Sequence, residues 1–288
     1  MFVDACRKAK GFTRPVATSL RYQDGTVGTT LNSFIMVNRD GWAITAAHTF
    51  DSLVKHEADR KKIAEIENMQ APADGSPRAP PKLDPKFILN HSFWWGWDGV
   101  MISEVTIDRR VDIALVKLVN FKPNMISNYP VFADPDEVSL GMSVCRVGHP
   151  FMDPPTDFDA SMNAFRIPKI DSDSALFVND GVVSKIVTMK KAGNSPFDAM
   201  YLDTSTPGYR GQAGGPIVDK EGRVCAMQVN SFAVPFGFHS TSEEKSPLDD
   251  QYCCIGRGVH VKTIRQFLDS KNVRYSSYDD EQEFRIVE

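Results

Sequence analysis

Short apolar segments rich in Val, Ile, Thr and Phe recur along the chain, and turn signals separate them. Two of these turns, NRDG at 38–41 and DKEG at 219–222, place glycine where a positive φ costs little, which favours β-hairpins. The segments are SFIMVNRDGWAIT (33–45), DIALVKL (112–118), SVCRVG (143–148), GVVSKIV (181–187), GPIVDKEGRVCAMQV (215–229) and GVHVKTI (258–264). Because they are too short and too numerous for an α/β fold, the sequence predicts an all-β fold.

Two stretches in the first half interrupt this pattern. Residues 50–70 combine charged residues and helix formers with apolar residues at Leu53, Ile63 and Ile66, which predicts a surface helix. The Pro-rich segment 71–85 that follows cannot be helical and is expected to be extended and exposed.

The second half contains an irregular stretch and a further helix. Residues 150–175 have no strand pattern, and a structureless loop of this length is usually functional or mobile. Residues 262–270 predict a helix, which an acidic tail follows. We expect an N-terminal barrel domain over 1–125, with an insertion at about 50–90, and a C-terminal barrel domain over 126–288.

The composition restricts the classes of partner. Of the 288 residues 42% are hydrophobic, which is enough for a sizeable core. The net charge of −4 offers no basic surface, so nucleic acid is not expected as a partner. The N-terminal MFVDACRKAKGF lacks the apolar core of a signal peptide, and no apolar run approaches the ~18 residues that span a bilayer. We therefore expect a cytoplasmic protein without membrane contact.

The cysteines and histidines indicate no metal chemistry. The five cysteines are odd in number and show no C-x-x-C spacing, so reduced thiols are expected rather than a disulfide framework or a zinc site. The six histidines show no H-E-x-x-H spacing. We expect neither a metal ion nor a cofactor.

Three local patterns combine the residue types of an acyl-transfer site. AITAAHTF places His48 directly after an apolar strand, RRVDIALVKL places Asp112 at the start of another, and YRGQAGGPIV places Ala213 in a glycine-rich loop before a third. Acyl transfer needs a nucleophile, a histidine that takes its proton, and a carboxylate that orients the imidazole. The order His, Asp, nucleophile is one of those known for this geometry. Ser205 and Ser231 are poor substitutes for the missing nucleophile, because neither lies in a turn that could supply an oxyanion hole.

Taken together, these motifs resemble the trypsin-like serine proteases, and within them the HtrA/Deg-type bacterial branch, from about residue 28 to 268. GWAITAAH resembles the strand leading into the catalytic histidine, and VDIALVKL the strand that follows the catalytic aspartate. LGMSVCRVGHPF, GVVSKI and LDTSTPGYRGQAGGPIVDKEGRVCAMQVN resemble later segments of the same branch. The resemblance implies two packed six-stranded antiparallel β-barrels, split near residues 123–135, with the active site between them and a C-terminal helix.

The resemblance also implies a role for each site residue. His48 would be the general base, Asp112 would orient it, and Ala213 occupies the position of the nucleophile, where serine is expected. The oxyanion hole would consist of the backbone N–H groups of Gly211 and Ala213, with the amide of Gln212 as a further contributor.

A substrate pocket is implied as well. Pro207 would lie at its floor and Gly258 on its wall. Because no carboxylate stands at Pro207, we expect a small or medium apolar side chain before the cut rather than Lys or Arg. His260 and Arg257 lie nearby in the sequence, and an acidic side chain is the alternative if these two residues point inward.

The expected function is that of a serine endopeptidase that cleaves protein substrates through an acyl-enzyme, here in an inactive Ser-to-Ala form. The alternative is a natural pseudoprotease that binds peptides or partner proteins. The retention of His48, Asp112 and Gly211 favours the first interpretation. The insertions at 50–90 and 150–175 have no counterpart in the family, and we expect them to contact a regulatory protein or the substrate; passive surface loops are the alternative.

Overall fold

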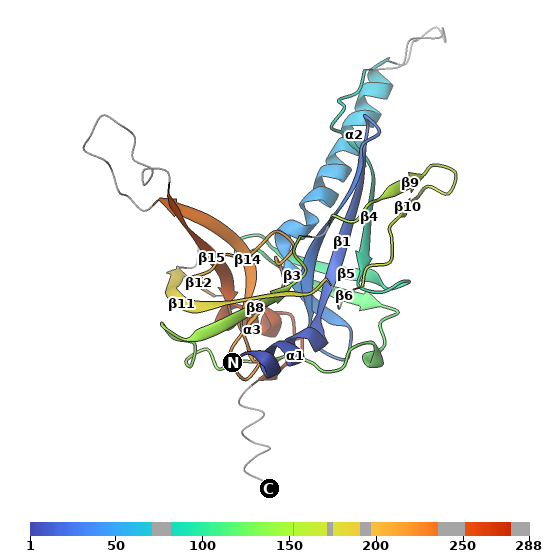
Figure 1. Cartoon of the computed structure of the whole chain (residues 1–288). Coiled ribbons are helices and arrows are strands. Elements are labelled where there is room, and N and C mark those ends of the chain that lie inside the picture. The colour runs from blue at the N-terminus through green and yellow to red at the C-terminus, as the bar shows by residue number, and fades with distance from the viewer. Residues whose placement is uncertain (71–81, 152, 172–174, 191–196, 236–250, 278–288) are drawn as a thin grey trace, which may run out of the picture.

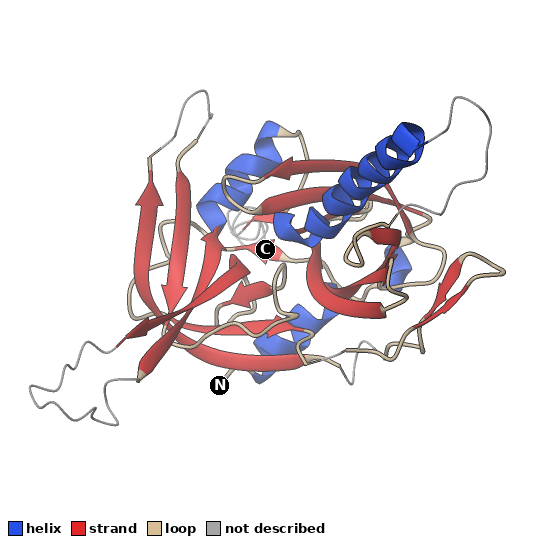
Figure 2. Ribbon diagram, turned by 90° about the horizontal axis from the view of Figure 1, so that it is seen from above, coloured by secondary structure: helices blue, strands red, loops and turns tan. Residues whose placement is uncertain are grey.

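A computed structural model describes residues 1–70, 82–151, 153–171, 175–190, 197–235 and 251–277. Two curled, mainly antiparallel sheets lie side by side, and α2 runs along the outside of the first sheet (Figures 1 and 2). The elements are α1 (Val3–Phe12), β1 (Thr13–Tyr22), β2 (Val27–Met36), β3 (Trp42–Ala46), η1 (Ala47–Phe50), α2 (Asp51–Gln70), β4 (Ile88–Trp95), β5 (Met101–Asp108), β6 (Ile113–Val119), η2 (Pro123–Met125), β7 (Val131–Phe132), β8 (Ser143–Gly148), β9 (Asp157–Asp159), β10 (Ala164–Arg166), β11 (Phe177–Met189), β12 (Ala199–Thr204), β13 (Pro216–Val218), β14 (Val224–Pro235), β15 (Tyr252–His260), α3 (Val261–Ser270) and β16 (Ser276–Ser277).

The first sheet has six strands in the order β4-β1-β2-β3-β6-β5. The predicted NRDG turn connects β2 to β3, and Gly41 has the positive φ of 84° that the turn requires. β3 pairs with β6 so that Ala46 lies opposite Ile113. This register brings the residues after β3 next to the residues before β6, which is where the two predicted catalytic motifs meet.

The second sheet forms a closed ring of six strands. Its order is β13-β8-β11-β12-β15-β14, and the pairing of β13 with β14 closes the ring. The short strands β7 and β16 extend the sheet beyond β14. The all-β fold with two packed curled sheets and a C-terminal helix is confirmed.

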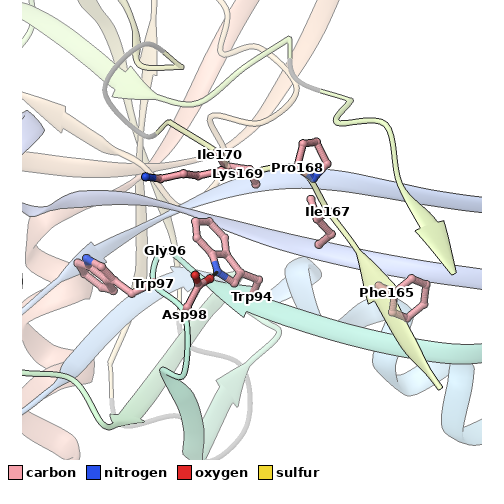
Figure 3. A pocket seen from close by; sticks show the side chains of 9 residues that line it. All are labelled: Trp94, Gly96, Trp97, Asp98, Phe165, Ile167, Pro168, Lys169 and Ile170. Atoms are coloured by element: carbon pink, nitrogen blue, oxygen red, sulfur yellow. Dashed lines mark hydrogen bonds between the residues drawn. The ribbon is translucent and has the colours of Figure 1, made fainter. Parts of the chain in front are cut away.

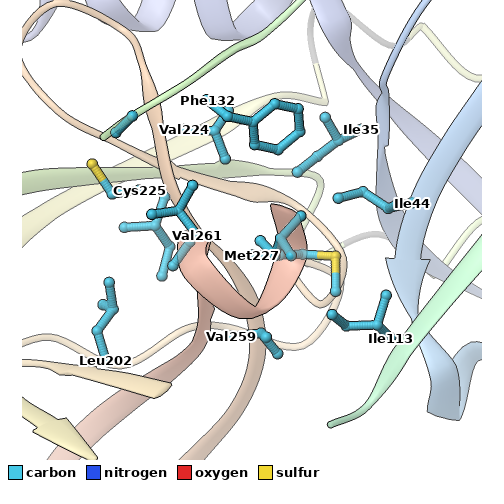
Figure 4. Close-up of a cluster of buried hydrophobic side chains, with 14 of the residues drawn as sticks. Ile35, Ile44, Ile113, Phe132, Leu202, Val224, Cys225, Met227, Val259 and Val261 are labelled. Atoms are coloured by element: carbon cyan, nitrogen blue, oxygen red, sulfur yellow. The ribbon is translucent and has the colours of Figure 1, made fainter. Parts of the chain in front are cut away.

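One core joins the two sheets. Ile35, Ile44 and Ile113 of the first sheet belong to the same buried cluster as Val224 and Met227 of the second (Figure 4). All five side chains are 0% exposed. Because the sheets share this core, residues on one sheet are held at fixed positions relative to residues on the other.

Helices cover the outside of the sheets. The predicted helices are confirmed as α2 and α3. The sequence did not predict α1, whose Ala5, Ala9 and Phe12 are buried against the second sheet. No helix among the described residues has the length and apolar character needed to cross a bilayer.

The described residues of the 150–175 insertion contain more regular structure than expected. It contains a two-stranded hairpin of β9 and β10, in which the rings of Phe158 and Phe165 lie 5.1 Å apart. Each strand has only three residues, too few for a periodic pattern to predict it. Most of the Pro-rich segment, residues 71–81, and the tail from 278 lie outside the described residues.

Candidate active site

His48 and Asp112 form a hydrogen-bonded couple where β3 ends and β6 begins in the first sheet. His48 Nδ1 lies 2.8 Å from Asp112 Oδ2, and Asp112 Oδ1 accepts the backbone N–H of His48 at 2.9 Å. The side chains are 39% and 29% exposed, so a substrate can reach the ring. With Nδ1–H donated to the carboxylate, the lone pair of Nε2 is free to accept a proton.

The local backbone is shaped for this contact. Asp112 immediately precedes β6 and has a φ of 56°, which is unusual for a residue other than glycine. Its backbone oxygen accepts the N–H of Ala47 at 3.1 Å. Asp112 therefore holds the turn after β3 through both its main chain and its carboxylate, and strained backbone of this kind concentrates at functional sites.

The carboxylate also sets the charge state of the ring. The hydrogen bond to Asp112 raises the pKa of His48 above its ordinary value of 6.5, although burial opposes the shift. The negative charges of Asp112 and Asp51 add to the increase. His48 is therefore suited to act as a base, because Asp112 stabilises the cation that forms once the ring has taken a proton.

Ala213 lies in a glycine-rich loop on the second sheet. Gly211 and Gly214 have φ values of 101° and 84°. The added Cβ of an alanine at Gly214 would lie 2.1 Å from the Ser33 carbonyl oxygen and 3.1 Å from the Ala46 nitrogen. The loop therefore packs directly on the end of the strand that leads to His48, and only glycine permits this approach.

Ser33 of β2 connects the first sheet to this loop, and no sequence pattern marks it as a site residue. Its N–H donates to the Ala213 carbonyl at 2.8 Å, and its hydroxyl donates to the Gly211 carbonyl at 2.9 Å. The same hydroxyl accepts the N–H of His149 at 3.1 Å. Two hydrogen bonds donated by this fully buried residue thus hold the nucleophile loop, and the third holds the chain that follows β8.

The expected oxyanion donors lie at the tip of the loop. The backbone N–H groups of Gly211 and Ala213 take part in no hydrogen bond among the described residues, which leaves them available to a substrate oxygen. The side chain of Gln212 is fully buried; its Nε2 donates to Asn179 Oδ1 at 3.0 Å and its Oε1 accepts the N–H of Tyr209 at 2.9 Å. The Gln212 amide therefore stabilises the loop through hydrogen bonds inside the protein.

The expected pocket residues do not all lie together. Pro207 precedes the nucleophile loop, and its carbonyl accepts a hydrogen bond from Arg146 at 3.0 Å. His260 is 1% exposed, and its Nδ1 accepts the N–H of Lys262 at the start of α3. Gly258 faces Ile217 and Ala226 in the barrel interior.

Gly258 and Gly256 differ in the residue of β14 that each faces. Ser231, which hydrogen-bonds to Gly208, pairs with Gly256 rather than Gly258. A bulge between Gln228 and Asn230 shifts the register of β14 against β15, and this shift cannot be predicted from the sequence.

The alternative specificity residue Arg257 is already neutralised. Its guanidinium makes two hydrogen bonds to Asp203, at 2.7 and 2.9 Å. Because this bidentate pair neutralises the guanidinium, Arg257 is not available to bind an acidic side chain of a substrate.

A separate cavity of about 500 Å³ lies between the end of β4 and the 165–170 segment (Figure 3). Trp94 and Asp98 line one side, joined by a hydrogen bond of 2.9 Å, and Phe165 and Ile167 line the other. The residues that line this cavity are not those expected at the active site. In the described part of the chain, no group of three or more His, Cys, Asp or Glu side chains could hold a metal ion.

The two packed sheets, with a His–Asp couple on one and a glycine-rich loop on the other, define a trypsin-like serine protease fold. A family model described as the trypsin-like peptidase domain matches residues 32–227. This match covers more than half of the chain and includes His48, Asp112 and Ala213, and the protein belongs to this family. A comparison with curated proteins found no match.

Proposed function

We propose that this chain is a serine endopeptidase of the HtrA/Deg-like branch in a form that carries alanine at the nucleophile position. The observation that supports the proposal best is the 2.8 Å contact between His48 Nδ1 and Asp112 Oδ2, on the sheet that packs against the loop of Ala213. A contact of this geometry orients a general base, and such a base has no use in a simple packing role.

With serine at position 213, each residue has a defined task. The hydroxyl attacks the carbonyl carbon of the peptide bond, and His48 Nε2 takes its proton. The N–H groups of Gly211 and Ala213 stabilise the oxyanion, and His48 then returns the proton to the leaving amine. Water then attacks the ester carbon while His48 takes its proton, and His48 gives this proton to the departing serine oxygen, which releases the carboxylic acid and restores the hydroxyl.

With alanine at position 213, the acyl-enzyme cannot form. Members of a catalytic triad act as a unit, so the loss of one costs about as much as the loss of all. We expect the chain to bind polypeptide substrates and to cleave them only at a trace rate.

A natural pseudoprotease is the second candidate, and Ala213 itself favours it. The intact geometry around Ala213 favours the endopeptidase, because Gly211, Gly214 and the positive φ of Asp112 are all retained. The positive φ of Asp112 is costly at a residue other than glycine, and strain of this kind concentrates at functional sites.

The test compares the chain as given, Ala213→Ser, and Ala213→Ser with His48→Ala on a denatured protein substrate. We expect cleavage by the serine form alone. Absence of cleavage by the serine form, with candidate partner proteins also added, would establish the pseudoprotease.

We propose further that the 150–175 segment contacts a regulatory protein or the substrate. Phe151 is 69% exposed, and its ring lies 5.0 Å from that of Tyr209 in the nucleophile loop. Phe165 lines the cavity beside Trp94. If Phe151→Ala and Phe165→Ala change neither activity nor partner binding in the serine form, these residues are passive surface.

A further inference from the structure

Arg146 of β8 is a buried cation without a counter-charge. Its side chain is among the largest fully buried ones, with 2% of the residue exposed. All of its hydrogen-bond partners are neutral: Nε donates to Gln228 Oε1 at 2.7 Å, and the two terminal nitrogens donate to oxygens of Thr204, Thr206 and Pro207. No carboxylate of the described residues lies within 4 Å of it.

An unpaired buried charge is costly, and proteins normally neutralise one. Burial lowers the pKa of Arg146 to about 10, which is the direction expected where no anion compensates the charge. Arg257 provides the contrast within the same sheet, because Asp203 neutralises it. Structural packing alone does not account for a cation at position 146, since an uncharged side chain would fill the space at lower cost.

The partners of Arg146 belong to the two segments that frame the approach to the nucleophile position. Pro207 leads through Gly208 into the loop of Ala213. Gln228 is anchored to the other end of that loop, because its carbonyl accepts the N–H of Gly214 at 2.7 Å and its N–H donates to Gly215. A side chain that enters between these segments lies next to the bond to be cut.

Direct hydrogen bonds hold the two segments together. The Ser231 hydroxyl accepts the N–H of Gly208 and donates to the Gly208 carbonyl, both at 2.8 Å. The amide of Gln228 occupies the space beside Gly208, where an added Cβ would meet it at 2.3 Å. The oxygen of this amide already sits on Arg146, in the position that an oxygen of an incoming carboxylate would take.

We infer that Arg146 selects an acidic side chain, Asp or Glu, in the substrate residue that precedes the cut. The substrate carboxylate displaces the Gln228 amide from Arg146 and accepts further hydrogen bonds from Gly208 N–H and Ser231 O–H. The charge-assisted bond to Arg146 replaces a neutral one, and the buried cation gains the anion it lacks. This inference rests on the proposed function for its cleavage site, but the binding step does not require the nucleophile.

The experiment uses paired peptides that differ only in having Glu or Gln before the cut, so that shape is matched and charge is not. In the Ala213→Ser form we expect kcat/KM for the Glu peptide to exceed that for the Gln peptide by about tenfold or more. The chain as given, which does not cleave, is titrated with product peptides that end in Glu or Gln, and the same preference is expected in Kd.

Two variants assign the preference to Arg146. Arg146→Met should remove it, but this variant changes a buried residue and is at risk of misfolding. Gln228→Glu supplies an internal carboxylate to Arg146, so it should remain folded and lose the preference for Glu.

Equal handling of Glu and Gln peptides, or a preference that survives in Gln228→Glu, overturns the inference. A serine form that cleaves both peptides equally leaves the proposed function standing. If the serine form cleaves neither peptide while the chain as given still binds the Glu product more tightly, the proposed function is overturned. The inferred binding site for an acidic side chain then still stands.

Discussion

Asp112 holds His48 at two atoms at once, the ring Nδ1 through one carboxylate oxygen and the backbone N–H through the other. The ring therefore has a fixed orientation and a fixed tautomer, and the turn that carries it is fixed as well. Asp112 therefore orients the ring in addition to contributing negative charge, and substitutions can distinguish these two effects.

In the Ala213→Ser form, Asp112→Asn should lower kcat by about 10⁴-fold, because an amide favours the wrong tautomer of the ring. Asp51→Asn is the matched control. Asp51 also raises the pKa of His48, but it is an exposed partner of Arg109 and does not touch the ring. Its loss should change kcat only a few-fold, and equal effects of the two substitutions would contradict an orienting role for Asp112.

The pH dependence follows from the raised pKa of His48. The base is active when neutral, so cleavage by the serine form should rise with pH through a pKa above 6.5 and then level off. The stabilising contact of the protonated ring with Asp112 acts in the opposite sense. Its contribution to the free energy of unfolding is complete below the unfolded-state pKa of about 6.5 and is lost as the pH rises through the folded-state pKa.

Nuclear magnetic resonance of the ring protons measures this value directly. Burial lowers the pKa of His91 and His260 to about 4, so these two rings should not titrate in the same range. A His48 pKa below 6.5 would contradict the net stabilisation of the protonated ring by Asp112 and Asp51 over the opposing effect of burial.

Alanine substitutions at two glycines with similar φ distinguish the cost of steric crowding from the cost of backbone strain. Gly214 (φ 84°) has no room for a Cβ, whereas Gly25 (φ 88°) has nothing within 4 Å. Gly25→Ala should cost about 1–2 kcal/mol, the typical cost of this backbone region. Gly214→Ala adds overpacking of about 1–3 kcal/mol and displaces the loop. Denaturant unfolding measures both, and equal losses would mean that the loop does not pack tightly on Ser33 and Ala46.

Ser33→Ala tests the connection between the two sheets. It leaves the Gly211 carbonyl and the His149 N–H without their hydroxyl partner in a buried site, which should destabilise the protein by about 1–3 kcal/mol. In the serine form, kcat should fall more than KM rises, because the residue positions the loop without touching substrate. Ser184→Ala, which removes an exposed hydroxyl of β11, is the control and should change neither the stability nor the kinetic constants.

The sequence was informative where the site depends on local patterns and their order. His48 and Asp112 follow and precede strands whose apolar character is visible in a few residues, and the register of β3 with β6 then brings them together. Ser33 carried no such signal, because its role depends on contacts with residues more than a hundred positions away. The pairing of Ser231 with Gly256 could not be predicted for a related reason, since a β-bulge decides which glycine faces Ser231.

The helix α1 and the cation Arg146 illustrate the same limit. α1 has no side-chain N-cap, and burial against the second sheet, rather than its own sequence, accounts for it. Arg146 lies in a segment, SVCRVG, whose alternation predicts a strand correctly but does not reveal that the side chain is buried among neutral oxygens.

The most direct test of the central claim is labelling of the Ala213→Ser form with a fluorophosphonate, a reagent that forms a covalent bond with activated serine hydroxyls. Intact-mass and peptide-level spectrometry locate and count the adduct. We predict a single adduct on the serine at position 213, with none on the chain as given and a greatly slowed reaction when His48→Ala is added. No adduct at position 213, or an adduct whose rate is unchanged by His48→Ala, would contradict the claim that His48 and Asp112 are poised to activate a nucleophile there.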